Sequence, residues 1–344
     1  MSTVIFLLPF LLLYTVLVVY AERKLSAFMQ DRLGPMEVGP YGILQTVADL
    51  LKLLQKERIV PTTASPWLFA VAPVLIFMAV FLSMSVLPLH AHWAGAPINS
   101  SLFFVLAIAG LDVAGIMIAG WASGNKYSTL GSIRAIAQII SYEVPLGLSV
   151  LCVAIFNGTL NLQEISIAQS SDATTYFLGI STFDMSEGGF LSWNVFQMPL
   201  LFIVWIIYFI CALAESNRAP FDLPEAESEL VAGFQTEYSG FSWAIIMLSE
   251  YGMMLLTSIL GVILFFGSWN SPFPGTFGEY TSGPIWGISW IITKTFIFVA
   301  MQIWVRWTFP RLRINQVMAL SWKYLTPILL INLVLISIWK LILL

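Results

Sequence analysis

The sequence predicts an all-α protein that crosses a membrane several times. Of its 344 residues, 58% are hydrophobic and only 10% are charged, whereas soluble domains carry roughly 25% charged residues. Eight apolar stretches approach the ~20 residues that a helix needs to cross the hydrocarbon core: 4–20, 66–88, 101–122, 137–157, 195–214, 243–267, 284–305 and 324–343. We therefore expect a single membrane domain over residues 1–344, with about eight transmembrane helices.

The basic residues predict the orientation of these spans. Stretches 89–100, 158–192 and 268–283 contain no Lys or Arg, whereas the alternate connections carry them. By the positive-inside rule, both termini face outward. The first span lacks the small-residue cleavage pattern of a signal peptide, so we expect it to be retained. Segments 21–65, 123–136, 215–242 and 306–323 are then cytoplasmic loops, and 158–192 is a solvent-exposed outer loop.

The first cytoplasmic segment should contain a helix that lies in the membrane interface. Apolar residues repeat at helical spacing from Ile43 to Leu54, while Gln45, Asp49 and Lys52 occupy the opposite side. This pattern is typical of an amphipathic interfacial helix. A helix that only braces the bundle would show the same pattern.

The sequence offers no recognisable cofactor site. Cys152 and Cys211 fall inside predicted spans, and the chain has neither a Cys-x-x-Cys pair nor a dinucleotide-binding glycine motif. We expect no flavin, nicotinamide or iron–sulfur cluster on this chain. His90 and His92 have no third ligand nearby, so we expect an exposed histidine pair and no metal.

Three carboxylates fall within the predicted spans: Asp112, Glu143 and Glu250. Acids at this depth are costly and usually serve ion or proton handling. Pro145, just beyond Glu143, should free backbone carbonyls that share water or protons with the acid. Lys294 is the main candidate for a basic partner. The alternative is that these acids are neutral and serve packing through hydrogen bonds.

A polar island separates the fifth and sixth spans. Residues 214–230, AESNRAPFDLPEAESEL, hold five carboxylates and one arginine. If a helix begins at Pro224, Asp222, Glu225 and Glu229 share one of its faces, and their titrations should be coupled. An ordinary acidic loop is the alternative, but Phe221 and two prolines favour fixed structure.

Several motifs resemble one family. The island is similar to the signature of the H subunit of respiratory complex I, the membrane-embedded NADH:quinone oxidoreductase, whose mitochondrial counterpart is NADH dehydrogenase subunit 1. The early segment 21–42, with AERK and the GP and GPYG turns, resembles the first loop of the same family. So do GWAS at 120–123 with NKY at 125–127, and Arg134-Ala135 leading to Ser141-Tyr142-Glu143.

The resemblance implies a quinone channel and an acidic path that couples it to proton pumping. The implied quinone-binding residues are Arg23, Lys24, Arg32, Phe221 and Asp222. The implied proton path comprises Asp49, Glu143, Glu215, Glu225, Glu227, Glu229 and Glu250. Asp112 lies outside the motifs that we can match.

The resemblance also implies the partners. Flavin and iron–sulfur clusters would belong to other complex I subunits, and this chain would contact quinone-site peripheral subunits, small membrane subunits and antiporter-like subunits. It implies membrane quinone and lipid as ligands, no nucleic acid, and a multi-pass location in the bacterial cytoplasmic membrane. The alternatives are a homologous membrane anchor of an energy-converting hydrogenase or formate hydrogenlyase, and a stand-alone proton-coupled transporter.

Overall fold

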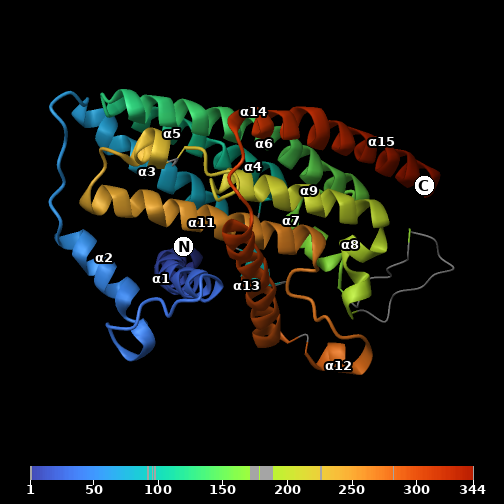
Figure 1. Cartoon of the computed structure of the whole chain (residues 1–344). Helices are drawn as coiled ribbons and strands as arrows, with labels where there is room; N and C mark the ends of the chain where they lie inside the picture. The colour runs from blue at the N-terminus through green and yellow to red at the C-terminus, as the bar shows by residue number, and fades with distance from the viewer. Residues whose placement is uncertain are drawn as a thin grey trace.

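The computed structural model describes residues 2–90, 93–94, 96, 98–170, 178, 189–224, 227–281 and 283–343. Helices dominate this part of the chain (Figure 1), as predicted. The main helices are α1 (Ser2–Met29), α2 (Gln45–Gln55), α3 (Pro66–Met84), α4 (Ser101–Ala109), α5 (Leu111–Ala122), α6 (Lys126–Asn157), α9 (Pro199–Glu215), α11 (Gly240–Phe265), α13 (Pro284–Thr308), α14 (Ile314–Ala319) and α15 (Thr326–Leu343).

Short elements connect these helices. They are η1 (Pro40–Gly42), α7 (Leu162–Ile167), η3 (Gly189–Ser192), α8 (Asn194–Gln197), α10 (Glu227–Leu230), η4 (Gly233–Gln235), α12 (Gly275–Tyr280) and the π-helical turn η5 (Leu320–Leu325). The described strands are β1 (Pro88–His90) and β2 (Trp93–Ala94), which pair antiparallel. The all-α prediction therefore missed one short hairpin.

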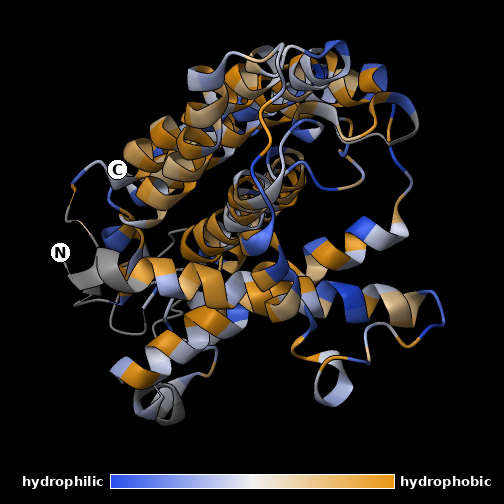
Figure 2. Cartoon of the chain, turned by 90° about the vertical axis from the view of Figure 1, so that its left-hand side faces the viewer, coloured by the Kyte–Doolittle hydropathy of each residue, from blue (hydrophilic) through white to orange (hydrophobic). Residues whose placement is uncertain are grey.

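Each predicted span lies on a helix. Six described segments are long and apolar enough to cross a membrane: α3, α4 with α5, α6, α11, α13, and α14 through α15. Helix α9 is apolar but shorter, with 17 residues, and the 28 residues of α1 include the first predicted span. Hydrophobic residues cover these helices and hydrophilic ones gather in the connections (Figure 2). The chain is an integral membrane protein.

Helix α11 is the centre of the bundle. It is almost wholly buried and contacts α1, α2, α3, α9 and α13. In Figure 1, α3, α5, α6, α9 and α15 lie on one side of it, whereas α1, α2 and α13 lie on the other. Two faces of α11 therefore pack against two different groups of helices.

The loop predictions need three corrections. Helix α6 begins at Lys126, where the Asn125 side chain caps it by accepting from the backbone N–H of Tyr127 at 3.0 Å; most of 123–136 is thus helix rather than loop. Segment 306–323 includes the end of α13, all of α14 and part of η5. In segment 158–192, Leu162 and Ile165 of α7 are fully buried, whereas Phe190 and Leu191 are exposed, so only part of the described segment is packed.

The first loop folds back through glycine-dependent turns. Gly42 has a φ of 75°, and a Cβ there would lie 2.3 Å from the carbonyl oxygen of Pro35, so this turn requires glycine. Helix α2 follows and is amphipathic, as predicted. It lies beside α1 and α11, which places its inner face against the bundle.

Lys294 does not neutralise an intramembrane acid, contrary to the prediction. Its ammonium donates to three backbone carbonyls just beyond α11, those of Phe266 at 2.8 Å, Ser268 at 3.0 Å and Asn270 at 2.7 Å. It also lies 4.2 Å from the ring centroid of Trp193. An ammonium has three donors, so Lys294 caps the end of α11 and has a structural role.

We expect Lys294→Met to destabilise the protein. Each carbonyl left buried without a donor costs about 1–3 kcal/mol, so unfolding in graded SDS should occur at a clearly lower detergent fraction. Lys340→Met is the matched control because Lys340 is half-buried and its ammonium donates to the carbonyl of Phe156. Equal shifts for the two variants would contradict the capping role.

Candidate functional site

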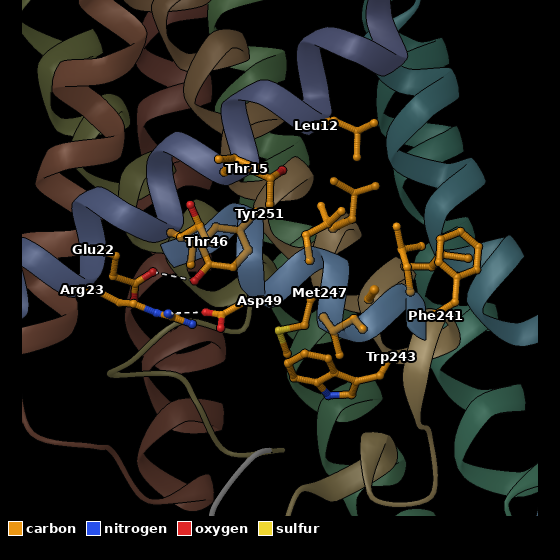
Figure 3. Close-up of a pocket in the computed structure, with 18 of the residues that line it drawn as sticks. Leu12, Thr15, Glu22, Arg23, Thr46, Asp49, Phe241, Trp243, Met247 and Tyr251 are labelled. Atoms are coloured by element: carbon orange, nitrogen blue, oxygen red, sulfur yellow. Dashed lines mark hydrogen bonds and ion pairs between the residues drawn. The ribbon is translucent and has the colours of Figure 1, made fainter. Parts of the chain in front are cut away.

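A large cavity lies between α1, α2, α11 and α13. Its volume is about 560 Å³, within the roughly 300–1,000 Å³ of sites that bind small organic ligands. Figure 3 shows side chains from α1, α2 and α11 converging on it. Its described lining comprises Leu8, Leu12, Thr15, Val16, Val19, Glu22, Arg23, Ser26, Thr46, Asp49, Leu50, Leu53, Leu54, Phe77, Phe241, Trp243, Ala244, Ile245, Met247, Leu248, Tyr251, Arg306 and Trp307.

The two ends of the cavity differ in chemistry. In Figure 3, Glu22, Arg23 and Asp49 gather at one end, whereas Phe241 and Trp243 lie at the other. The remaining walls are almost entirely aliphatic or aromatic. The cavity therefore suits an amphipathic ligand with a hydrogen-bonding head and an apolar tail.

Glu22 organises the polar end. Its buried carboxylate accepts from the Tyr251 hydroxyl at 2.8 Å and from the Arg306 guanidinium. Arg218 lies 3.7 Å away and stacks on the Tyr251 ring at 4.1 Å. These partners come from α11, α13 and the segment after α9, so one acid joins three distant parts of the chain to α1. Hydrogen bonds between an ionised donor and a carboxylate are roughly twice as strong as neutral ones, so this group ties the four segments together.

A second ion pair fixes α2 to α1. The Arg23 guanidinium lies 2.5 Å from one carboxylate oxygen of Asp49, and the Gln45 amide donates to the other at 3.2 Å. Asp49 is on the inner face of α2, so the pair closes the polar end of the cavity between the two helices. Asp49 is predicted for the proton path, and the structure places it in the cavity wall.

Four carboxylates occupy the opposite face of α11. A small cavity of about 10 Å³ is lined by Asp112, Glu215, Asn217 and Glu250, among others, which is near the space that one water needs. Glu215 interacts electrostatically with Asp112 and with Glu143. Asp112, Glu143 and Glu250 therefore form an acidic cluster with Glu215. Glu143, Glu215 and Glu250 are predicted for one proton path, but the sequence does not show that they meet, and it gives Asp112 no role.

The two sites are contiguous through α11 and the segment after α9. Tyr251 lines the large cavity, and its neighbour Glu250 lines the small one. Arg218, beside Glu22, follows Glu215 and Asn217 of the small cavity. The Gln235 amide donates to Glu250 at 2.5 Å. The polar end of the large cavity and the acidic cluster are therefore joined by neighbouring residues of α11 and of the segment after α9.

Of the predicted quinone-binding residues, only Arg23 lines the described cavity wall. Lys24 donates to the carbonyl of Leu33 at 3.0 Å, and Arg32 is exposed. Phe221 is buried and packs edge-on against Tyr142, with ring centroids 5.2 Å apart. Lys24, Arg32 and Phe221 each lie outside that wall.

Asp222 is held by a different arginine. Its carboxylate accepts from Arg311 at 2.9 Å, and it does not line the described cavity. Burial raises the pKa of the Asp222 carboxyl, and the nearby Arg311 opposes that shift. The fixed structure predicted for this segment is present, since Phe221 and Leu223 are buried.

Of the remaining predicted acids, Glu229 lies outside both described cavity linings. Glu229 is an exposed residue of α10 whose carboxylate lies 2.5 Å from Arg134 of α6. The described α10 spans Glu227–Leu230, and Pro224 lies in a turn before it. The common face of Asp222, Glu225 and Glu229 stays a prediction, because Glu225 is not among the described residues. Glu225 and the side chain of Glu227 lie outside the described residues.

Sequence reasoning overlooked Glu22, Tyr251 and Arg306 as site residues. Each belongs to an apolar helix, and the three are far apart in the sequence. Only the tertiary structure shows that they line the same end of the cavity. His90 also differs from its prediction. It is buried, with its ring 6.0 Å from that of Trp269, whereas His92 lies outside the described residues.

Residues 1–337 match the model of a family described as NADH dehydrogenase. The chain is 51% identical to NADH-quinone oxidoreductase H subunit 2 of Cytophaga hutchinsonii, over 98% of each chain. The H subunit of the enzyme from Chlorobium luteolum is 50% identical over 93% of this chain and 83% of its own length. Its counterpart in Polaromonas naphthalenivorans is 44% identical over 92% of this chain and 84% of its own.

The family resemblance of the loop motifs is thereby confirmed over almost the whole sequence. The matched region includes all the elements that line the large cavity and the acidic cluster. The chain belongs to the NADH dehydrogenase family, together with the H subunits of NADH-quinone oxidoreductase.

Proposed function

We propose that this chain is the membrane subunit of a proton-pumping NADH:quinone oxidoreductase and that its large cavity admits membrane quinone. The observation that carries the proposal is the chemical polarity of the cavity. A quinone has two carbonyl acceptors on its ring and an apolar tail, and the cavity has donors at one end and apolar walls along the rest.

The polar end supplies the contacts that a quinone ring needs. Arg23, Tyr251 and Arg306 carry N–H or O–H donors that line the cavity, and quinone carbonyls accept such bonds. Negative charge that develops on the ring during reduction would be stabilised by the guanidinium groups. The chain itself performs no redox step in this proposal, and electrons would come from flavin and iron–sulfur clusters in partner subunits.

The acidic cluster supplies the coupling. When the ring charge changes, the hydrogen bonds around Glu22 and Tyr251 respond first, and Arg218 transmits the change towards Glu215. Buried like-charged acids have coupled titrations, because they cannot all ionise cheaply, so a nearby change of charge shifts protons among them. Protons would then shift through Glu215, Asp112, Glu143 and Glu250 towards antiporter-like partners.

We expect Leu12→Trp to raise the KM for a long-tailed quinone roughly tenfold. The larger ring fills the apolar end and displaces about two methylene groups of the tail, at about 0.8 kcal/mol each. A short-tailed quinone should be affected far less. NADH-driven quinone reduction in native membranes would provide both KM values.

Leu13→Trp is the matched control for that experiment. Leu13 is 61% exposed and lies outside the described cavity wall, so its enlargement should leave both KM values unchanged. Equal effects of Leu12→Trp on long-tailed and short-tailed quinones would argue against a tail in this part of the cavity.

We expect Glu215→Gln to lower quinone reduction and proton pumping together, by at least about tenfold, because general acid–base groups contribute at least that much. The isosteric amide keeps the packing of the buried site but removes the titratable proton. Sealed membrane vesicles allow both rates to be measured in one preparation. Glu164→Gln, which changes a carboxylate of α7 outside both cavity linings, should retain normal rates. Near-normal rates for Glu215→Gln in an assembled complex would refute this role.

A further inference from the structure

Pro145 leaves one carbonyl of α6 without its usual partner. In an α-helix the carbonyl of residue i accepts from the N–H of residue i+4, and proline has no N–H. Pro145 lies inside α6, so the carbonyl of Ser141 lacks its usual i+4 donor. The sequence alone suggests that water or Glu143 would use the freed carbonyl.

A hydroxyl from the last helical segment takes this place instead. The Ser321 hydroxyl donates to the Ser141 carbonyl at 2.5 Å, and Ser321 is fully buried. Serine in a helix commonly donates back to its own i−4 carbonyl, as Ser337 does to Leu333. Ser321 therefore acts between helices, unlike Ser337.

The two segments exchange hydrogen bonds reciprocally. The i−4 carbonyl of Ser321 is that of Val317, and it accepts from the Tyr142 hydroxyl of α6 at 3.0 Å. Tyr142 and Ser141 are adjacent, so α6 receives one bond and returns one at the same level. Ser321 and Tyr142 are both buried, which makes an unpaired group at this seam costly.

The π-helical turn places Ser321 for this bond. Within η5, the backbone N–H of Thr326 donates to the Ser321 carbonyl across five residues, and the Thr326 hydroxyl donates to it at 2.9 Å. Such widened turns are rare and occur frequently at functional sites. The turn therefore presents the Ser321 hydroxyl to α6 while its own backbone remains satisfied.

Glu143 lies within the turn that this bond closes. It stands between Ser141 and Pro145, and its carboxylate faces Gly110, where a Cβ would be 3.4 Å from Oε1. Any widening of the turn at Pro145 moves Glu143 relative to Glu215 and Asp112, with which it interacts.

We propose that Ser321 is a positioning residue for Glu143: its hydroxyl replaces the amide hydrogen that Pro145 lacks and holds the turn that carries the carboxylate. This inference rests on the proposed proton path, in which Glu143 takes part. Ser321 itself touches neither cavity in the described wall.

A double-mutant cycle in the assembled complex tests the inference. Proton pumping by sealed vesicles would be measured per assembled complex for Ser321→Ala, Pro145→Ala and the double variant. We expect Ser321→Ala to lower pumping several-fold in the wild-type background. Pro145→Ala gives the Ser141 carbonyl its own amide donor, so adding Ser321→Ala to that background should change little.

Two further variants separate the hydroxyl from the side-chain volume. Ser321→Thr keeps the donor and should retain most of the pumping rate. Ser337→Ala, in the following helix α15, removes a hydroxyl that bonds within its own helix and should leave the rate unchanged. If Ser321→Ala prevents assembly, restoration by Pro145→Ala shows that the hydroxyl acts through the Ser141 carbonyl, and pumping by the assembled double variant then tests the positioning of Glu143.

Three results would overturn it. Equal losses from Ser321→Ala in both backgrounds, an assembly defect that Pro145→Ala does not relieve, or unchanged pumping by Ser321→Ala each mean that Ser321 does not act through the Ser141 carbonyl. Glu143→Gln separates failure of the proposed proton path from failure of the positioning role. Normal pumping by Glu143→Gln refutes the proton path through Glu143. A loss by Glu143→Gln without a loss by Ser321→Ala refutes only the positioning role of Ser321.

Discussion

The buried carboxylate of Glu22 is the interaction on which the rest of the structure depends. It joins α1 to α11 through Tyr251, to α13 through Arg306 and to the segment after α9 through Arg218. Removing one member of such a buried charged network leaves the others uncompensated, at a cost of about 3–5 kcal/mol. The polar end of the large cavity is built around this group.

Helix α11 contributes residues to both the large cavity and the acidic cluster. One face carries Tyr251 into the large cavity, and the opposite face carries the preceding residue, Glu250, into the acidic cluster. A ligand that accepts a bond at the polar end competes directly for the donors of Glu22. In the proposed function, this coupling is electrostatic and short-ranged, and it needs no movement of whole helices. The Arg23–Asp49 pair closes the cavity on the other side by holding α2 in place.

Hydropathy and charge bias were sufficient to predict the helical spans, because burial in lipid requires about the same number of apolar residues everywhere. They could not predict which charged groups meet. Lys294 is expected from sequence to pair with an acid, yet it satisfies three carbonyls beyond α11, because it lies beside the turn that follows that helix. Glu22 escapes sequence analysis because its partners Tyr251 and Arg306 are far away along the chain. Pro145 indicates a free carbonyl, but only the tertiary structure shows that Ser321 occupies it.

Photo-crosslinking of the assembled complex with a photoreactive quinone, followed by peptide mapping of this chain, would show whether quinone occupies the large cavity. We expect labels on cavity residues of α1 and α11, such as Leu12 and Met247, and their loss when excess unlabelled quinone competes. Competable labelling confined to other parts of the chain, or to other subunits alone, would contradict the occupation of this cavity by quinone.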